Sequence, residues 1–150
     1  MIDPALEDRI AIRELNAAYV DAVMRRDAGA MSAVWAPDGR WFFLGQWIEG
    51  RDNIMARWQK AMDGFPVVCH QMTSEQISVS GDEARSRVYL VEEVVTADQK
   101  PLKFVGVYND VCIRLDEGWR YSSRRFDLIY QGRGSLEPKG WLGYGGQQSG

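Results

Sequence analysis

The chain from residue 67 onward consists of four long stretches in which apolar and polar residues alternate, and this pattern constrains the fold more than any other feature. Short turns separate the stretches, for example at residues 81–83 and 116–118. Alternation with a period of two indicates strands, and tight turns between consecutive strands predict an antiparallel meander. The predicted strands span residues 67–80, 84–96, 102–115 and 119–131.

Before residue 67 the apolar residues recur at helical spacing instead. Asp3 is suited to cap a helix and Pro4 to open it, and this helix is predicted to stop near residues 27–29. A short second helix is predicted over residues 30–35, closed by a turn at residues 37–39. The apolar face of the first helix is made by Ile12, Leu15, Tyr19, Ala22 and Val23.

Two short strands are predicted next, at residues 40–44 and 47–48, and then a third helix with Asp52 as its N-cap and Gly64 at its end. Helices followed by a long, curved sheet predict an α+β fold. We expect a cone-shaped roll, in which N-terminal helices pack on a mostly antiparallel sheet and enclose a cavity. The cone is assigned residues 1–131. Residues 132–150 form a tail with 7 of the 15 glycines.

Composition excludes several classes of function. The net charge of −3 provides no basic surface, so a nucleic acid is not an expected partner. One histidine and two cysteines cannot build a Cys/His zinc site or a disulfide-rich scaffold, and no Gly-rich phosphate loop occurs, so neither metal nor cofactor is expected. The N-terminus lacks a signal-peptide pattern and no apolar run could cross a bilayer, which predicts a cytoplasmic protein with no membrane partner.

His70 is the candidate base for proton transfer, because it is the only imidazole and works near neutral pH. The alternative is a structural hydrogen bond. Glu92 shares its strand face with apolar neighbours, so an acid there needs a partner. It either lies in the cavity and supports His70, or forms an ordinary ion pair with Arg125 or Arg114.

Tyr19 and Tyr108 have two interpretations, packing in the core or pointing their hydroxyls into the cavity to polarise a carbonyl or a leaving oxygen. Arg124 and Arg125 are interpreted as an exposed or interface pair, with binding of a carboxylate or phenolate as the alternative. Six Trp, six Tyr and five Phe supply aromatic surface for a pocket. The predicted substrate-binding residues are Met24, Trp41, Phe43, Trp58, Met72 and Arg125.

Several short motifs, each weak alone, occur in an order and spacing typical of one family. The motifs are Ile12-Arg13-Glu14-Leu15, Val34-Trp35-Ala36-Pro37-Asp38-Gly39, His70, Gly106-Val107-Tyr108-Asn109-Asp110 and Asp116-Glu117-Gly118-Trp119-Arg120-Tyr121. With these motifs the chain resembles, over residues 5–131, the SnoaL-like families of the nuclear transport factor 2-like superfamily. Within that superfamily it is most similar to the group of scytalone dehydratase, bile-acid dehydratase and hexachlorocyclohexane dehydrochlorinase.

The resemblance implies an activity and a set of site residues. Enzymes of that group are cofactor-free lyases, which remove a proton and a leaving group from a cyclic substrate inside the cone. The resemblance implies His70 as the base, Tyr19 and Tyr108 as cavity hydroxyls, and Glu92 as an acid on the following strand. It also implies a homodimer or homotrimer. One position departs, because the aspartate that orients the histidine in those lyases is Met24 here.

Residues and resemblance together predict a cofactor-independent lyase of the dehydratase type, acting on carbon–oxygen bonds, or an isomerase. The predicted substrate is small, hydrophobic, oxygenated, and aromatic or polycyclic, and the predicted chemistry is proton transfer by His70 in an enclosed cavity. Two alternatives remain open. One is a non-catalytic module of the same fold for small-molecule binding or assembly, and the other is a member of the polyketide-cyclase or hydrolase type.

Overall fold

The helices and the four long strands lie close to the positions predicted from the sequence. The structure is a computed structural model, and it describes residues 1–136 and 138–145. In chain order the elements are α1 (Pro4–Arg25), α2 (Ala28–Ala33), β1 (Trp35–Phe43), β2 (Gln46–Glu49), α3 (Arg51–Gly64), β3 (Val67–Ser80), β4 (Glu83–Val95), β5 (Pro101–Leu115), β6 (Gly118–Gly132) and the 3₁₀ turn η1 (Pro138–Gly140).

Local sequence signals set the ends of α1. The Asp3 carboxylate caps the helix by accepting a hydrogen bond from the Ala5 amide at 3.0 Å, and Pro4 occupies the first turn. Arg26 ends the helix in the left-handed conformation, with φ of 53°. The buried stripe of α1 includes Ile12, Leu15, Tyr19, Ala22 and Val23, as predicted.

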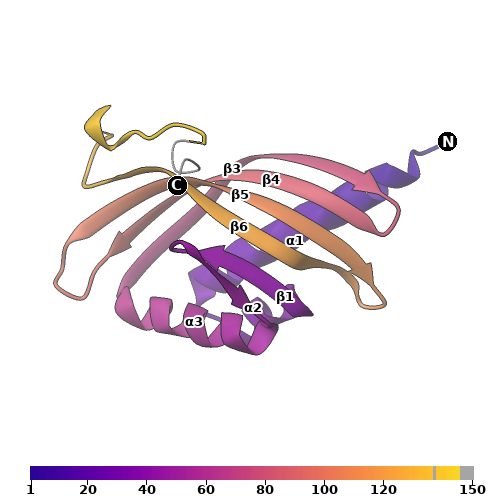
Figure 1. Ribbon diagram of the computed structural model, residues 1–150, viewed down its shortest axis with the longest axis horizontal. Helices are drawn as coiled ribbons and strands as arrows, with labels where there is room; N and C mark the ends of the chain where they lie inside the picture. The colour runs from indigo at the N-terminus through magenta and orange to yellow at the C-terminus, as the bar shows by residue number, and fades with distance from the viewer. Residues whose placement is uncertain (137, 146–150) are drawn as a thin grey trace.

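The six strands form one sheet in the order β2-β1-β6-β5-β4-β3. The meander β3–β6 is antiparallel throughout, and only the β1–β6 pair is parallel. The helix α1 packs along β3 and reaches β6, while α3 packs against β1 and β2 (Figure 1). We call the face of the sheet that meets α1 the inner face. The predicted α+β architecture is confirmed.

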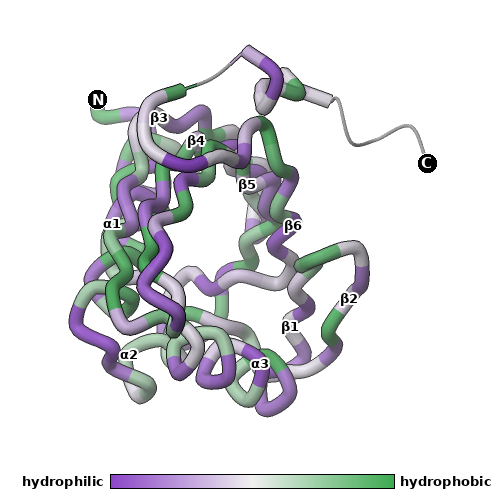
Figure 2. The backbone as a smooth tube through the Cα atoms, turned by 90° about the vertical axis from the view of Figure 1, so that its left-hand side faces the viewer, coloured by the Kyte–Doolittle hydropathy of each residue, from purple (hydrophilic) through white to green (hydrophobic). Residues whose placement is uncertain are grey.

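Bulges bend the long strands so that the sheet curls without closing, with α1 and β3 at one side and β1 and β2 at the other (Figure 2). One register shift lies between Val105 and Gly106. At this position a Cβ atom would lie 2.2 Å from Cε2 of Phe126, so glycine is required for the close approach.

The second helix and the strand after it start earlier than predicted. The Asp27 side chain accepts a hydrogen bond from the Ala30 amide at 2.9 Å, so α2 begins at Ala28. Trp35 then pairs with Tyr121 of β6, which makes it the first residue of β1 rather than the last of a helix. The predicted turn at residues 37–39 is therefore an irregularity inside β1, between the two segments that pair with β6.

The prediction of Asp52 as the N-cap of α3 is also wrong. Gly50 occupies the cap with φ of 86°, a conformation that glycine adopts without strain, and no side chain caps the helix. Asp52 lies one residue inside the first turn, where its negative charge still favours the N-terminal end of the helix dipole.

Part of the predicted tail docks on the sheet. Trp141 forms an isolated antiparallel bridge with Tyr130, and the Leu142 amide donates to the Ile129 carbonyl at 2.7 Å. The ring of Tyr144 lies 6.4 Å from that of Tyr89. Residues 137 and 146–150 of this tail lie outside the described part of the chain. Within the described part, no helix is long and apolar enough to cross a membrane.

Candidate active site

A cavity of about 820 Å³ opens between the tip of the β1–β2 hairpin and the inner face of β4, β5 and β6. It exists because β1 separates from β6 after Phe42, which lies opposite Arg125, so the sheet parts at this end. Of the predicted binding residues, Phe43 and Arg125 line this cavity, together with Glu92 and Tyr108. Its walls are mainly apolar and aromatic, including Phe65, Phe104, Leu90, Leu128 and Phe126.

His70 and Glu92 form a pair beside this cavity. They lie directly opposite each other on β3 and β4, and cross-strand partners in an antiparallel pair point to the same face. The His70 Nδ1 atom is 2.5 Å from Oε2 of Glu92. The histidine side chain is 1% exposed and the glutamate side chain 25%. Glu92 therefore supplies the carboxylate for His70 that position 24 lacks.

The two predicted tyrosines lie next to this pair. The Tyr19 ring is 5.7 Å from the His70 ring, and the Tyr108 ring is 6.1 Å from it. Their hydroxyl oxygens are 3.4 Å apart. Burial is the main cause that raises the pKa of both phenols, and it raises that of Tyr108 well above the ordinary value. Both hydroxyls therefore stay protonated at neutral pH and can donate hydrogen bonds.

Arg124 is fully buried, so the interpretation of residues 124 and 125 as an exposed or interface pair is wrong for this residue. Its Nε and Nη2 atoms each donate to Asp110 at 2.8 Å, in a bidentate pair whose side chains are both 0% exposed. Asp110 and Arg124 are direct cross-strand partners on β5 and β6. The guanidinium also lies over the rings of Tyr19, Tyr108 and Tyr121, at 4.4, 3.9 and 4.0 Å.

Asn16 completes this buried network from α1. Its side-chain oxygen accepts a hydrogen bond from the Tyr121 hydroxyl at 2.6 Å, and Nη2 of Arg124 lies 3.4 Å from the same oxygen. Burial alone would lower the pKa of Arg124, but Asp110 and Tyr121 raise it well above the ordinary value, so the guanidinium stays charged. The sequence analysis missed this network, although Asp110 lies two residues from Tyr108 and an acid on the same strand face could have indicated a basic partner.

The other arginines considered as partners of Glu92 are engaged elsewhere. Arg125 pairs with Asp127 at 2.9 Å and lies over the Phe42 ring. Arg114 pairs with Asp8 at 2.7 Å and with Asp82 at 3.0 Å. The predicted alternative of an ordinary ion pair between Glu92 and either arginine is therefore wrong.

Several residues predicted to bind substrate lie outside the 820 Å³ cavity. Met24 and Met72 border a separate groove of about 580 Å³ between α1 and β3, and Met24 is 48% exposed. The Met24 sulfur accepts a hydrogen bond from the His70 amide at 3.3 Å. Trp41 and Trp58 are buried in the core and do not line the cavity, although the Trp41 ring stacks on that of Phe43 at 4.4 Å.

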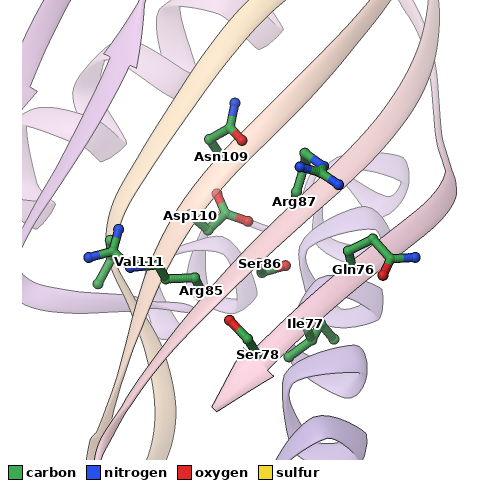
Figure 3. A pocket seen from close by; sticks show the side chains of 9 residues that line it. All are labelled: Gln76, Ile77, Ser78, Arg85, Ser86, Arg87, Asn109, Asp110 and Val111. Carbon is green, nitrogen blue, oxygen red and sulfur yellow. The ribbon is translucent and has the colours of Figure 1, made fainter. Parts of the chain in front are cut away.

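A third hollow, of about 390 Å³, lies over β3, β4 and β5 at the other end of the sheet (Figure 3). Polar and charged side chains from neighbouring strands surround it, among them Gln76, Arg85, Arg87 and Asn109. Arg85 and Arg87 are exposed, and Arg85 pairs with Glu83 at 3.5 Å. This hollow lacks the apolar walls that a small hydrophobic molecule needs.

Comparison with known proteins assigns the chain to a family. The sequence profile of the SnoaL-like domain matches residues 4–125. An uncharacterized protein of Mycobacterium tuberculosis is 32% identical over 124 residues, covering 79% of this chain and 84% of that protein.

Two solved structures have the same fold. One is a candidate scytalone dehydratase from Novosphingobium aromaticivorans, with a TM-score of 0.82, 18% identity, and coverage of 91% of this chain and 94% of that chain. The other is the hexachlorocyclohexane dehydrochlorinase LinA-type3 from Novosphingobium barchaimii, with a TM-score of 0.80, 18% identity, and coverage of 89% and 97%. At these identities the likeness concerns the fold alone.

Proposed function

Because the chain belongs to the SnoaL-like domain family, as the resemblance in its sequence predicted, we propose that it is a cofactor-independent lyase or isomerase. Its substrate is a small, hydrophobic, oxygenated compound with an aromatic or polycyclic skeleton. The observation that carries the proposal is the His70–Glu92 pair at the wall of an apolar cavity, with the Tyr108 hydroxyl beside it.

The arrangement supports elimination of water from a β-hydroxy ketone. One member of the His70–Glu92 pair removes a proton from the carbon next to the carbonyl. The electron pair of that bond forms the carbon–carbon double bond, and the carbon–oxygen bond breaks. The Tyr108 hydroxyl, which lines the cavity and whose oxygen is 3.4 Å from that of Tyr19, donates a hydrogen bond to the oxygen on which negative charge develops. The leaving hydroxyl takes up the proton that the pair has accepted and departs as water, which returns the pair to its starting protonation state.

The cavity supports the proposed substrate class by size and by chemistry. Its volume of about 820 Å³ is that of pockets which enclose a small organic molecule. Phenylalanine rings supply flat apolar walls, on which an aromatic or polycyclic skeleton can stack. The polar side chains in its lining are those of Glu92, Tyr108, Arg125, Asp127 and Gln131, and the first two lie against the histidine.

The test uses 3-hydroxy-1-tetralone, a bicyclic β-hydroxy ketone that yields 1-naphthol when it loses water and tautomerises. We expect the wild-type chain to accelerate formation of naphthol, followed by absorbance and mass spectrometry. The double variant His70→Ala/Glu92→Gln removes both members of the pair, and we expect the rate to fall by about 10²–10⁴-fold. Glu93→Gln is the matched control, because Glu93 is next in sequence but points to the opposite face and pairs with Lys103.

Two results would contradict the proposal. Equal turnover by the wild type and the double variant would exclude the pair. A wild-type chain whose melting temperature rises with the tetralone, but which forms no product from it or from related hydroxy ketones, would favour the non-catalytic binding module instead.

A further inference from the structure

The two members of the His70–Glu92 pair face different hollows. Glu92 lines the 820 Å³ cavity, and a quarter of its side chain is exposed there. His70 is absent from the residues that line this cavity and borders the groove of about 580 Å³ between α1 and β3. A molecule in the cavity therefore meets the carboxylate, with the imidazole behind it.

We propose that Glu92 is the catalytic base that contacts the substrate, and that His70 is a positioning residue which holds the carboxylate through Nδ1. This assignment rests on the proposed function and reverses the roles predicted from the sequence, in which Glu92 supports a catalytic His70. It also explains how the pair operates with Met24 at position 24, since the carboxylate already faces the cavity and needs no second acid behind the histidine.

The hydrogen bonding within the pair supports this division. The contact from Nδ1 occupies Oε2 of Glu92, so Oε1 is left to accept a proton from the substrate. The His70 Nε2 atom is buried, and among the described residues it has no hydrogen-bond partner. A neutral imidazole protonated on Nδ1 donates to Glu92 and leaves Nε2 as a lone pair, whereas a second proton would be an unpaired buried donor.

The surroundings of His70 suit a rigid support. Tyr19 and Tyr108 contact its ring, and the Met24 sulfur accepts a hydrogen bond from its amide. Glu92 has apolar neighbours at the cavity, with Phe104 as its partner on β5 and Leu90 two residues away on the same face. These neighbours cannot hold a carboxylate in place by hydrogen bonds, so the single contact from His70 fixes its orientation.

The test measures proton abstraction directly, with 5-nitrobenzisoxazole as a flat aromatic probe. A base takes the hydrogen from carbon 3, the electron pair of that bond forms the nitrile, and the nitrogen–oxygen bond breaks to release a coloured phenolate. The proton remains on the base until solvent removes it. No metal, cofactor or oxidant takes part, so the rate reports the base and its orientation.

Three variants separate the two roles. Glu92→Gln keeps the size of the side chain and removes the base, and we expect a fall of about 10²–10⁴-fold, with Glu93→Gln as the unaffected control. His70→Asn keeps an N–H donor near the place of Nδ1, and we expect its rate to stay within about ten-fold of wild type. His70→Gln keeps a donor near the place of Nε2 instead, and we expect a larger loss than for His70→Asn.

Contrary results are equally clear. Two results would contradict Glu92 as the base and favour Nε2 of His70. One is a wild-type rate of benzisoxazole cleavage in Glu92→Gln, and the other is a fall in rate in His70→Asn as large as in Glu92→Gln. If the variants fail to fold, ¹⁵N NMR of the single histidine in the wild type decides. We expect 1-naphthol to shift the Nδ1 resonance more than the Nε2 resonance, and the opposite order overturns the assignment.

The two probes also separate this inference from the proposed function. Cleavage of the benzisoxazole that depends on Glu92, without dehydration of the tetralone, would support Glu92 as the base and contradict the dehydratase. Dehydration of the tetralone that survives Glu92→Gln would support the dehydratase and contradict Glu92 as the base. A wild-type chain that acts on neither probe contradicts both.

Discussion

Two buried polar clusters lie side by side on the inner face of the sheet, and they differ in what completes them. The closed cluster consists of Asn16, Asp110, Tyr121 and Arg124. The open cluster consists of Tyr19, His70, Glu92 and Tyr108. The Arg124 guanidinium joins them, because it lies over rings of both clusters.

In the closed cluster Asp110 supplies the partners of Nε and Nη2 of Arg124, whereas the buried Nη1 atom has no hydrogen-bond partner among the described residues. The charges of Arg124 and Asp110 neutralise each other, and both side chains are 0% exposed. In the open cluster Glu92 lines an apolar cavity, and its side chain is 25% exposed. Both clusters hold buried polar groups, and only the open cluster is proposed as an active site, because Glu92 faces the cavity. A polar group that faces empty, apolar space is the better indicator.

The largest effect is expected when the closed cluster is broken. Asp110→Asn leaves the Arg124 guanidinium buried without its counter-charge, and we expect the free energy of unfolding to fall by about 3–5 kcal/mol. Urea denaturation measures it. The double variant Asp110→Leu/Arg124→Met removes both charges and should recover most of the loss. A single variant as stable as wild type would contradict a structural role for this pair.

Removing one hydroxyl from each cluster sharpens the comparison. Tyr108→Phe removes a donor at the cavity, and we expect turnover to fall by about 10²-fold with a stability change within about 1 kcal/mol. Tyr121→Phe removes the donor to Asn16, and we expect a loss of about 1–2 kcal/mol in stability with unchanged turnover. Turnover and urea denaturation are measured for both variants. Equal effects of the two substitutions on turnover would contradict the different roles of the two clusters.

Alkaline pH is expected to destabilise both clusters together. Burial is the main cause that raises the pKa of Tyr19, Tyr108 and Tyr121, so the folded chain holds these protons more tightly than the unfolded chain. Their contribution is fully present below the unfolded pKa of about 10 and is lost as pH rises above it toward the folded values. Urea denaturation between pH 9 and 11 should show this fall, and Tyr108→Phe should make it shallower. A flat profile would contradict the burial of these phenols.

The smallest effect is expected far from both clusters. Asp8 on α1 accepts hydrogen bonds from Arg114 and Trp119, and the contact with Arg114 is the main cause that lowers the pKa of Asp8. This stabilisation is present above the ordinary pKa of about 3.9 and is lost as pH falls through the lowered value. Asp8→Asn should therefore lower the melting temperature slightly at pH 7 and leave turnover unchanged. The difference should shrink at acid pH and in high salt.

The repeating parts of the fold were predictable from the sequence, because periodicity is a local property. Period two located the four meander strands to within two residues, and it placed Glu92 on the apolar face where His70 meets it. The start of β1 was not predictable in this way. Trp35 is in a strand because Tyr121, far along the chain, pairs with it.

The site was predictable only in part, for a related reason. Arg124 and Arg125 are adjacent and chemically identical, yet one is buried against Asp110 and the other borders the cavity and pairs with Asp127. Adjacent residues of a strand face opposite sides, and the pairing of β5 with β6, in which Arg124 lies opposite Asp110, determines which of the two is buried. Met24 was expected in the cavity from its family position, but it lies where the α1–β3 groove opens to solvent.

The glycine at position 106 has a consequence for how this cavity could diversify. A methyl group there would collide with the Phe126 ring, which is part of the cavity wall. Any larger residue would have to displace that ring, so the shape of the chamber depends on a position that does not line it. A single substitution of this glycine would thus reshape the chamber, while Glu92 and Tyr108 in its wall stay the same.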